Sequence, residues 1–427
     1  MVSIITHVQS YWKHFSPWYR RAVLVSLFSA GMAFGYALWH QIPPSVDARV
    51  YDTIAMHIVE GYGYRESLDV PLTHDFSIVR AGPAYEYFLA GIFLVFGHSY
   101  PAVWAVQALL HGATALLLFF IARALIADRK TGERMGFFAA FLFGISPDLI
   151  EISAMLLTET LYLFLVTLAI GAIVSVMQSP PRLAWSAAAG AVIGIAALSR
   201  PPVVLFLPIL CMWFFIRRLH RPMIFCVLAA VLVLTPWTIR NYRIFHEIVP
   251  TTMIGAYNIW LGNMPGSAGG QFNSADNPLV QFGQEHGFTS LNQKARLEFF
   301  HFVKNNPSEF VSLSAMRTVR YFSLIRPMGF WFYQDGLPLL AFVAASGIWI
   351  AVIFIAGIAG FLLSWKDRRN DVFRWLALLA ATAPVPLLLT VVQSRYRFQI
   401  YPFFALFAAY LLSVYKDRPR ETRLMAI

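Results

Sequence analysis

Long apolar blocks alternate with short polar stretches along most of the chain. The blocks are roughly 18 to 25 residues long and show no two-residue alternation, which favours membrane-spanning helices over a β-barrel. We therefore predict an all-α polytopic membrane protein with about ten transmembrane helices. The predicted spans cover residues 21–42, 101–126, 134–150, 158–177, 183–199, 201–216, 222–239, 337–364, 372–392 and 398–415.

Residues 1–20 precede the first span, and their pattern predicts a cytoplasmic, interfacial amphipathic helix. Its apolar side chains recur at three- to four-residue spacing: Ile4, Val8, Tyr11, Trp12, Phe15, Trp18 and Tyr19. The apolar run 22–39 then leads into His40 and Gln41 without a small-x-small cleavage site. We therefore expect a retained signal anchor.

Two polar segments interrupt the spans, and both are expected outside the membrane. The first external loop covers residues 43–100, and the second external segment covers 241–335, with the loop sequence GNMPGSAGG and a helical pattern over 290–322. The apolar stretch 83–97, with Pro83 and Glu86, is only about 15 residues long. Counting it as a span would place the arginine-rich stretch 123–134 outside. A juxtamembrane or re-entrant helix fits better.

Composition and charge agree with this topology. Hydrophobic residues make up 58% of the 427 residues and charged residues only 13%, with a mean hydropathy of +0.60. The net charge of +11 comes from basic clusters between spans, all on one predicted side, which the positive-inside rule makes the cytoplasm. Nucleic-acid binding is therefore not expected. Cys211 and Cys226 suggest neither a disulfide nor a metal site.

The predicted organisation has five parts and places both termini in the cytoplasm of a bacterial cell with the protein in its inner membrane. They are the amphipathic helix 1–20, an N-terminal transmembrane catalytic module 21–240, the external (periplasmic) segment 241–335, the C-terminal helices 336–415 and the tail 416–427.

Candidate chemistry begins directly after the first span. Asp47 and Asp52 lie at the predicted membrane surface, and Tyr51 shares a helical face with Asp47. A carboxylate here can deprotonate an acceptor hydroxyl while a sugar is displaced from phosphate, which requires one base and no nucleotide fold. An ordinary solvated acid that caps a helix is the alternative.

Four arginines lie at predicted outer ends of spans, against the usual charge bias: Arg200 in LSRPP, Arg240 in PWTIRNY, and Arg395 and Arg397 in QSRYRF. A guanidinium binds phosphate oxygens in a bidentate manner, and a phosphate ligand explains this placement. The alternative is that these side chains snorkel and pair with nearby acids.

Glu151 and Glu159 also lie near outer span ends, where an acid is a functional candidate or a capped, exposed residue. His57, His74 and Asp75 have no metal-ligand spacing. Motifs for nucleotide-driven transport or serine hydrolysis do not occur.

Several motifs resemble those of the polytopic glycosyltransferases of the C superfamily, in the branch of the protein O-mannosyltransferases and the lipid A aminoarabinose transferase. The similar segments run in the same order over most of the chain: DARVYDTIAMHIVEG at 47–61, RAGPAYEYFLAGIFLVFG at 80–97, LTETLY at 157–162, SRPP at 199–202, PWTIRNY at 236–242, GNMPGSAGG at 262–270 and SRYRFQIYP at 394–402.

The resemblance implies inverting transfer from an undecaprenyl- or dolichyl-phosphate sugar, with Asp47 as the catalytic acid. It draws Arg80 and Tyr85 into the first-loop site. Many relatives carry a second acid directly after the first, but here Ala48 follows, and Glu86 replaces the usual proline after tyrosine. Some relatives bind a divalent cation near the acid, so Asp47, Asp52 and Glu86 could share one; no metal ligand set is defined.

The sequence therefore predicts a glycosyltransferase that uses a polyprenyl-phosphate sugar as donor at the periplasmic face. The acceptor is a lipid, a glycan or a protein, and membrane lipids surround the chain. Asp47 is the predicted base, Asp52, Glu86 and Glu159 are second acids or acceptor or metal contacts, and Arg200, Arg240, Arg395 and Arg397 bind donor phosphate. Two alternatives stay open: an envelope-polysaccharide polymerase or ligase, and a transporter, although no internal repeat is visible.

Overall fold

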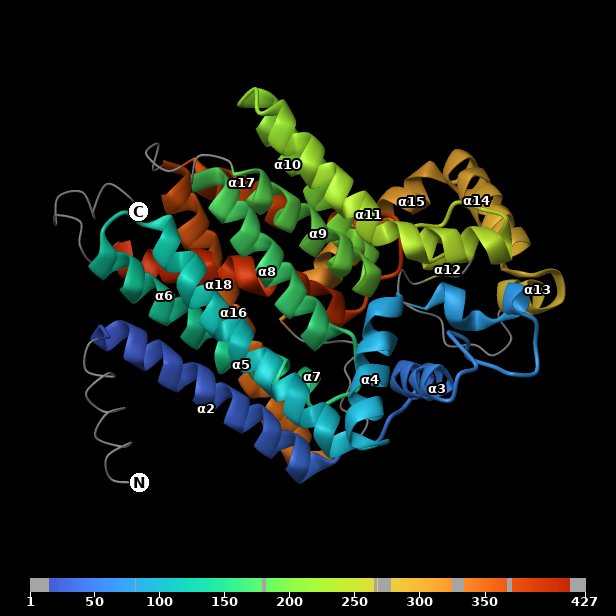
Figure 1. Cartoon of the computed structure of the whole chain (residues 1–427), viewed down its shortest axis with the longest axis horizontal. Helices are drawn as coiled ribbons and strands as arrows, with labels where there is room; N and C mark the ends of the chain where they lie inside the picture. The colour runs from blue at the N-terminus through green and yellow to red at the C-terminus, as the bar shows by residue number, and fades with distance from the viewer. Residues whose placement is uncertain are drawn as a thin grey trace.

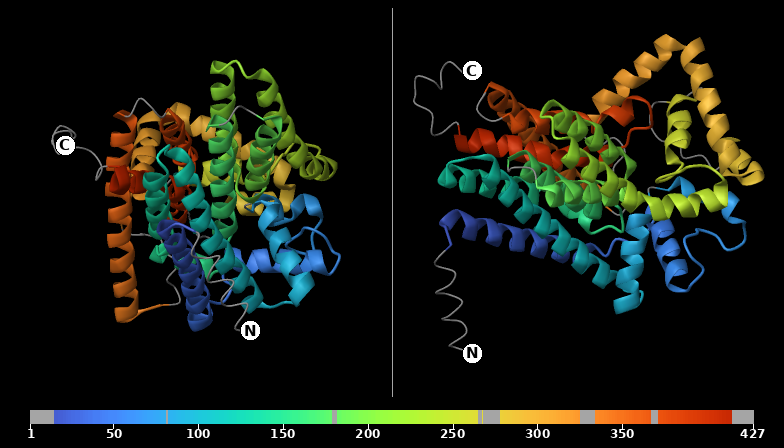
Figure 2. Two further views of the ribbon diagram at one scale, coloured as in Figure 1. Left: turned by 60° about the vertical axis from the view of Figure 1, so that its left-hand side comes forward. Right: turned by 45° about the horizontal axis from the view of Figure 1, so that its top comes forward.

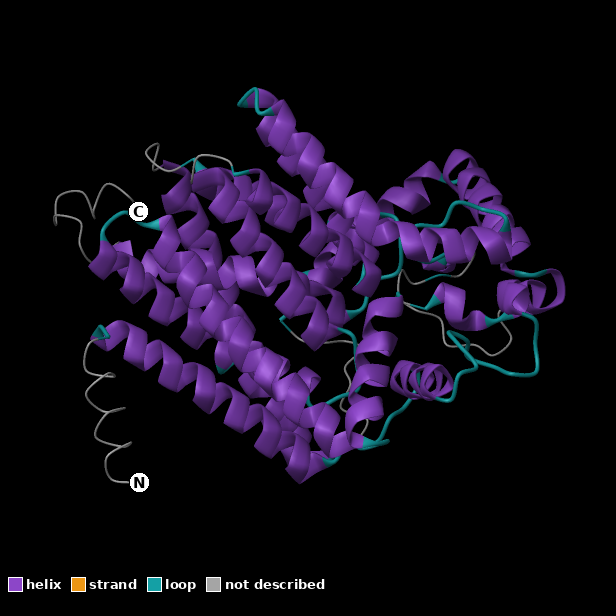
Figure 3. Ribbon diagram, in the orientation of Figure 1, coloured by secondary structure: helices purple, strands orange, loops and turns teal. Residues whose placement is uncertain are grey.

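The protein is helical throughout the part of the chain that the computed structural model describes (Figures 1 and 3). These residues are 15–80, 82–178, 182–264, 267, 278–324, 334–366 and 371–414, and they contain no strand. The predicted fold class is thereby confirmed. Most of the predicted helix 1–20, most of the GNMPGSAGG loop and the tail 416–427 lie outside the described residues.

A bundle of long apolar helices forms the body of the molecule, and each predicted span coincides with a helical segment. The segments are α2 (Pro17–His40), α5 (Tyr100–Leu125), α6 (Arg129–Gly144), α7 (Pro147–Ser153), α8 (Glu159–Gln178), α9 (Leu183–Ser199), η3 (Pro201–Leu205), α10 (Phe206–Ile216), α11 (His220–Phe245), α16 (Gly336–Lys366), α17 (Val372–Ala381), η4 (Val385–Leu388), η5 (Ser394–Ile400) and α18 (Tyr401–Val414).

By length and composition, fewer of the described helices qualify as membrane spans than the sequence predicts. Within the described residues, five helices are long and apolar enough to cross a membrane, and up to seven if each bent pair counts as one span. The predicted span 134–150 bends by 59° between α6 and α7, where Pro147 begins a new helix. Spans near 201–216 and 372–392 are short helices joined to 3-10 turns. The count of about ten remains a prediction.

A second group of helices covers one end of the bundle (Figure 1). Its members are α3 (Asp47–Val59), η1 (Leu72–His74), η2 (Phe76–Val79), α4 (Pro83–Phe96), α12 (Ile254–Asn263), α13 (Pro278–His286), α14 (Phe288–Asn305) and α15 (Pro307–Tyr321). Helix α4 lies across the bundle end rather than along it, as expected for a juxtamembrane helix. Helices α14 and α15 form a V-shaped pair that projects from this end (Figure 2).

Glycines allow neighbouring helices of the bundle to pack with their backbones in direct contact. A Cβ atom at Gly190 of α9 would overlap the Cys226 carbonyl of α11, and one at Gly360 of α16 would overlap the Phe407 carbonyl of α18. In a membrane, the hydrophobic effect does not drive helices together, and van der Waals packing takes its place. Small residues at the contact strengthen this packing because they let the helix backbones approach closely. These contacts fix the helices that carry the site described next.

Candidate active site

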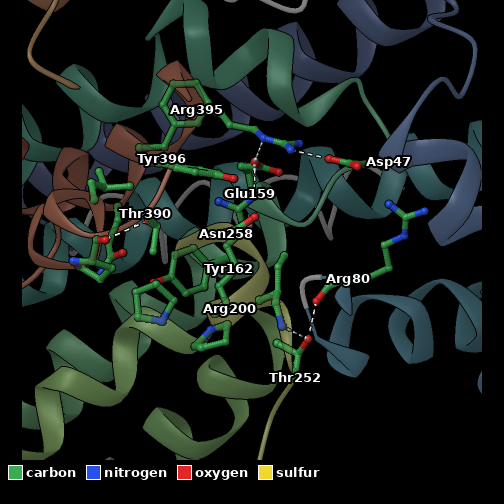
Figure 4. Close-up of a pocket in the computed structure, with 18 of the residues that line it drawn as sticks. Asp47, Arg80, Glu159, Tyr162, Arg200, Thr252, Asn258, Thr390, Arg395 and Tyr396 are labelled. Carbon is green, nitrogen blue, oxygen red and sulfur yellow. Dashed lines mark hydrogen bonds and ion pairs between the residues drawn. The ribbon is translucent and has the colours of Figure 1, made fainter. Parts of the chain in front are cut away.

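A cavity of about 450 Å³ opens where the second group of helices meets the bundle (Figure 4). Its polar lining comes from segments far apart in sequence: α3, the loop before α4, the start of α8, the end of α9, the region of α12, and η5. The charged residues of the lining are Asp47, Arg80, Glu159, Arg200 and Arg395.

Asp47 is the first residue of α3, where the positive end of the helix dipole favours an ionised carboxylate. The preceding Val46 has φ 51° and ψ −116°, a strained conformation for a β-branched residue. The Asp47 side chain is 18% exposed and accepts a hydrogen bond from Arg395 Nη2. Two parts of the chain separated by more than three hundred residues thus meet at this carboxylate.

Glu159 connects two arginines behind Asp47. Its Oε1 atom lies 2.5 Å from Arg200 Nη2 and 3.5 Å from Arg395 Nε, and its side chain is only 1% exposed. Arg200 Nε also donates to Thr158 Oγ1 at 2.8 Å. The guanidinium of Arg395 therefore lies between two carboxylates, as Figure 4 shows.

Arg80 lines the cavity on the side of Asp47 (Figure 4) and makes a bidentate contact with Glu66, at 3.0 and 2.8 Å. The cavity also has aromatic walls. The ring of Tyr396 lies 5.4 Å from the guanidinium carbon of Arg200, and the ring of Tyr162 lies 5.9 Å from the same carbon. These rings fix the plane of the Arg200 guanidinium.

The remaining wall is apolar and faces the bundle. It is formed mainly by η3, the turn after α17, and η4, through Pro201, Pro202, Val204, Leu205, Ala383, Pro386 and Leu387. A cavity with charges at one end and aliphatic side chains at the other is suited to an amphiphilic ligand with an anionic head.

The charges around the cavity determine the ionisation of Asp47. Three guanidiniums and two carboxylates line the cavity, and Arg80 is paired with a third carboxylate, Glu66, outside the lining. Burial alone raises the pKa of Asp47, but the charge and hydrogen bond of Arg395, helped by Arg80 and Arg200, outweigh burial and hold the pKa below its ordinary value. Asp47 is therefore ionised at neutral pH and can accept a proton.

The arrangement does not fit a divalent cation held by the three predicted acids. Both cavity carboxylates, Asp47 and Glu159, are bound to arginines. Among the described residues, no group of three or more His, Cys, Asp or Glu side chains is placed to hold a metal ion. Asp52 and Glu86, expected to share a cation with Asp47, have other partners.

Three predicted first-loop residues lie behind the cavity wall rather than in it. Asp52 accepts hydrogen bonds from Tyr100 and His98 at 2.9 and 2.8 Å, which tie α3 to the start of α5. Glu86 is fully buried on α4 and accepts from the Tyr64 hydroxyl at 3.2 Å. Tyr85 donates to Gln107 at 2.8 Å. Tyr51, which packs edge-on against Tyr85, reaches the cavity together with Asp47 and Arg80.

Two of the four predicted phosphate ligands also lie outside the cavity lining. Arg240 packs over the Trp237 ring at 4.7 Å and donates to the Tyr64 carbonyl at 2.9 Å. Arg397 is completely buried against Asp148. Arg200 and Arg395 are the two that the structure brings together, and both are tied to Glu159. The placement therefore supports a phosphate-binding role only for this pair.

Several cavity residues were not predicted from the sequence. Tyr162 follows Glu159 by one helical turn on α8, so the LTETLY motif contained a signal for it. Tyr396 lies between the two arginines of SRYRF. Thr252 and Asn258 come from the region of α12, where no motif marked them.

Comparison with solved structures first shows what the fold is similar to. The chain superposes on the crystal structure of an oligosaccharyltransferase from Archaeoglobus fulgidus in the apo form with a TM-score of 0.57 at 15% identity, covering 95% of this chain and 51% of that one. The oligosaccharyltransferase AglB from the same organism, in complex with an inhibitory peptide and a dolichol-phosphate, gives a TM-score of 0.55 at 16% identity, with the same coverage. The protein thus has the fold of these archaeal chains, and it spans about half of their length.

The family comparison then narrows the resemblance. The sequence model of the dolichyl-phosphate-mannose-protein mannosyltransferases matches residues 80–239. ArnT from Cupriavidus metallidurans bound to undecaprenyl phosphate is a more distant match, with a TM-score of 0.42 and 12% identity over 92% of this chain and 77% of that one. No curated protein matches the sequence significantly. The family match over residues 80–239 agrees with the resemblance found in the motifs, and the chain is a multi-pass integral membrane protein.

Proposed function

We propose that the protein is an inverting glycosyltransferase that moves a sugar from a polyprenyl-phosphate carrier to a lipid, glycan or protein acceptor at the periplasmic face. The observation that carries the proposal is the meeting of Asp47 with Arg200 and Arg395 in one cavity with an apolar wall. The matched archaeal enzyme was solved with a dolichol-phosphate, which supports a lipid phosphate as the ligand class.

The proposed donor fits the two halves of the cavity. The phosphate is bound by Arg200 and Arg395, whose guanidinium forks suit its oxygens. The first isoprene units lie along the apolar wall formed by η3 and η4, while the sugar points toward Asp47. The aliphatic tail continues into the bilayer, which agrees with the position of this wall on the bundle side.

The chemistry follows from the positions of these groups. Asp47 accepts the proton of the acceptor hydroxyl as its oxygen attacks the anomeric carbon. The bond from that carbon to the phosphate oxygen breaks, and its electron pair stays on the departing polyprenyl phosphate, whose added charge Arg200 and Arg395 stabilise. Attack opposite the leaving phosphate inverts the anomeric configuration.

The contacts of Arg395 imply that the donor binds before Asp47 acts as the base. Without donor it is bound to Asp47 and Glu159, so a phosphate must compete with both carboxylates for its guanidinium. A phosphate that draws Arg395 away also removes the charge that lowers the pKa of Asp47. Donor binding therefore makes the carboxylate a stronger base before the acceptor reacts.

The test is transfer of sugar from a purified polyprenyl-phosphate sugar by Asp47→Asn. We expect a loss of kcat of about 10²- to 10⁴-fold, because the amide cannot accept the proton. The matched control is Asp52→Asn, which changes the same group on the same helix but outside the cavity. Full activity of the Asp47 variant, or an equal loss in both, contradicts the proposal.

The alternative of a polymerase or ligase receives less support from the site. That class was expected to place its chemistry in arginines and histidines of the late external segment and to dispense with Asp47. His286 and His301 of this segment are exposed and absent from the cavity lining, whereas Asp47 is part of it.

A further inference from the structure

We propose that Asp148 and Arg397 are positioning residues whose buried ion pair holds η5 in the orientation that points Arg395 into the cavity. The inference rests on the proposed function, because its readout is binding of the donor phosphate. It assigns to Arg397 a role different from the direct phosphate contact that its sequence motif suggests.

Segment η5 presents its side chains in different directions. A 3-10 helix has three residues per turn, so neighbours in sequence point about 120° apart. Arg395, Tyr396, Phe398 and Gln399 line the cavity, whereas Arg397 does not. The two arginines of SRYRF therefore face opposite surroundings: one the cavity and the other the interior of the bundle.

Arg397 is anchored in that interior. Its side chain is 0% exposed, its Nη2 lies 3.3 Å from Asp148 Oδ2, and its Nη1 donates to the Ser323 carbonyl at the end of α15. The Asp148 side chain is 1% exposed and also accepts hydrogen bonds from the hydroxyls of Tyr401, at 3.0 Å, and Ser346. One buried carboxylate thus joins α7, η5, α18 and α16.

The ion pair between Asp148 and Arg397 links the two segments that carry the cavity residues Glu159 and Arg395. Asp148 is near the start of α7, the short helix that leads into α8 and so to Glu159. Arg397 is two residues beyond Arg395. The pair therefore couples the segment that delivers Glu159 to the segment that delivers Arg395, and these two side chains are only 3.5 Å apart.

Breaking the buried ion pair between Asp148 and Arg397 is energetically costly, so the pair can hold η5 in place. Removing one member of a buried ion pair leaves an uncompensated charge, which is strongly destabilising, while replacing both members is often tolerated. An unpaired Arg397 would be attracted to the carboxylates of the cavity, which lies on the other side of η5. Rotation of η5 toward it would displace Arg395, and a misplacement of about 1 Å at a reacting site can cost about 100-fold in rate.

The experiment measures binding of undecaprenyl phosphate and thermal unfolding on the same purified full-length samples. Asp148→Asn and Arg397→Gln are each expected to raise the Kd by about tenfold or more, the equivalent of about 1.4 kcal/mol. The double variant, which buries no charge, is expected to return to within about threefold of wild type. Ser346→Ala keeps the ion pair and serves as the matched control.

The outcomes separate the possible roles. Recovery in the double variant supports positioning. Wild-type Kd values in both folded single variants overturn it, because the pair would then serve stability alone. A double variant as weak as Arg397→Gln also overturns it, because Arg397 would then contact the phosphate directly.

A variant that keeps the positive charge at position 397 tests the proposal even if the charge-removing variants do not fold. Arg397→Lys keeps the pair with Asp148 but cannot also reach the Ser323 carbonyl with a rigid fork, so it is expected to fold and to bind donor severalfold more weakly. An unchanged Kd in this variant overturns the proposal. Wild-type protein that binds no undecaprenyl phosphate contradicts the proposed function itself, which distinguishes that failure from the failure of positioning.

Discussion

Replacement of Arg395 by glutamine tests the proposed site through two independent observables. Arg395 is bound to Asp47 and Glu159 in the donor-free cavity and is proposed to hold the donor phosphate. A hydrogen bond to a charged group contributes about 1.5 to 3 kcal/mol. Its loss should raise the KM for a polyprenyl-phosphate sugar by about 10- to 150-fold, since each 1.4 kcal/mol corresponds to a factor of ten.

The second observable is the pH dependence of kcat/KM, which reports ionisations of the free enzyme. Asp47 must be ionised to act, so activity falls as pH decreases through its pKa. In the wild type, Arg395, helped by Arg80 and Arg200, outweighs burial and keeps that pKa below its ordinary value. Without Arg395, the largest effect that lowers this pKa is lost and the pKa rises, so the acid limb of the variant should lie at higher pH. The contribution of Asp47 to folding stability, present above its unfolded pKa in the wild type, should weaken or reverse.

The assay is initial-rate transfer with donor varied at several pH values in detergent or nanodiscs. Arg243→Gln, at an exposed position near the end of α11, serves as a control for the loss of a positive charge. A variant of Arg395 with an unchanged donor KM and an unshifted acid limb refutes the reasoning. A raised KM with an unshifted limb would retain phosphate binding but refute the coupling of Arg395 to Asp47.

Three further changes probe packing, burial and the cavity wall. Gly190→Ala should lower stability by about 1 to 3 kcal/mol in thermal unfolding because its Cβ meets the backbone of α11, whereas Gly31→Ala, with open space around it, should not. Tyr162→Phe removes a buried hydroxyl with no protein partner in the described part of the chain, so stability should change by less than about 1 kcal/mol while the donor KM rises severalfold; an unchanged KM argues against a contact with substrate. Burial raises the pKa of Glu86 to about 8, so wild-type stability should fall relative to Glu86→Gln as pH rises from about 5 to about 8. The measurement is the difference in melting temperature between the two proteins. A constant difference over this pH range would show that the carboxyl is ionised throughout.

The sequence predicted the helical bundle because helices in lipid depend on local signals. Blocks of apolar residues define helices in lipid, and proline or an N-cap marks where several begin, as at Ser16, which accepts a hydrogen bond from the Tyr19 amide, and at Asp128, which accepts from the Thr131 amide. The same signals do not give the length of membrane each helix crosses, so bends such as that at Pro147 were not foreseen.

The site was predicted only in part, for a different physical reason. Asp47, Glu159, Arg200 and Arg395 were marked by an unusual charge at an outer span end, and all four line the cavity. The direction of a side chain within that end depends on its partner across the fold. Arg397 has the same sequence context as Arg395, but its partner Asp148 lies in a helix 249 residues away in sequence.

The distance along the chain between Asp47 and Arg395 also bears on when the protein becomes active. The first loop emerges early in synthesis, but the guanidinium that it contacts is added only near the end. A nascent chain already threaded into the bilayer would carry the carboxylate without the means to hold a lipid phosphate. The proposed activity therefore requires the final helices to join the bundle, and an incomplete chain is expected not to use a lipid-phosphate donor.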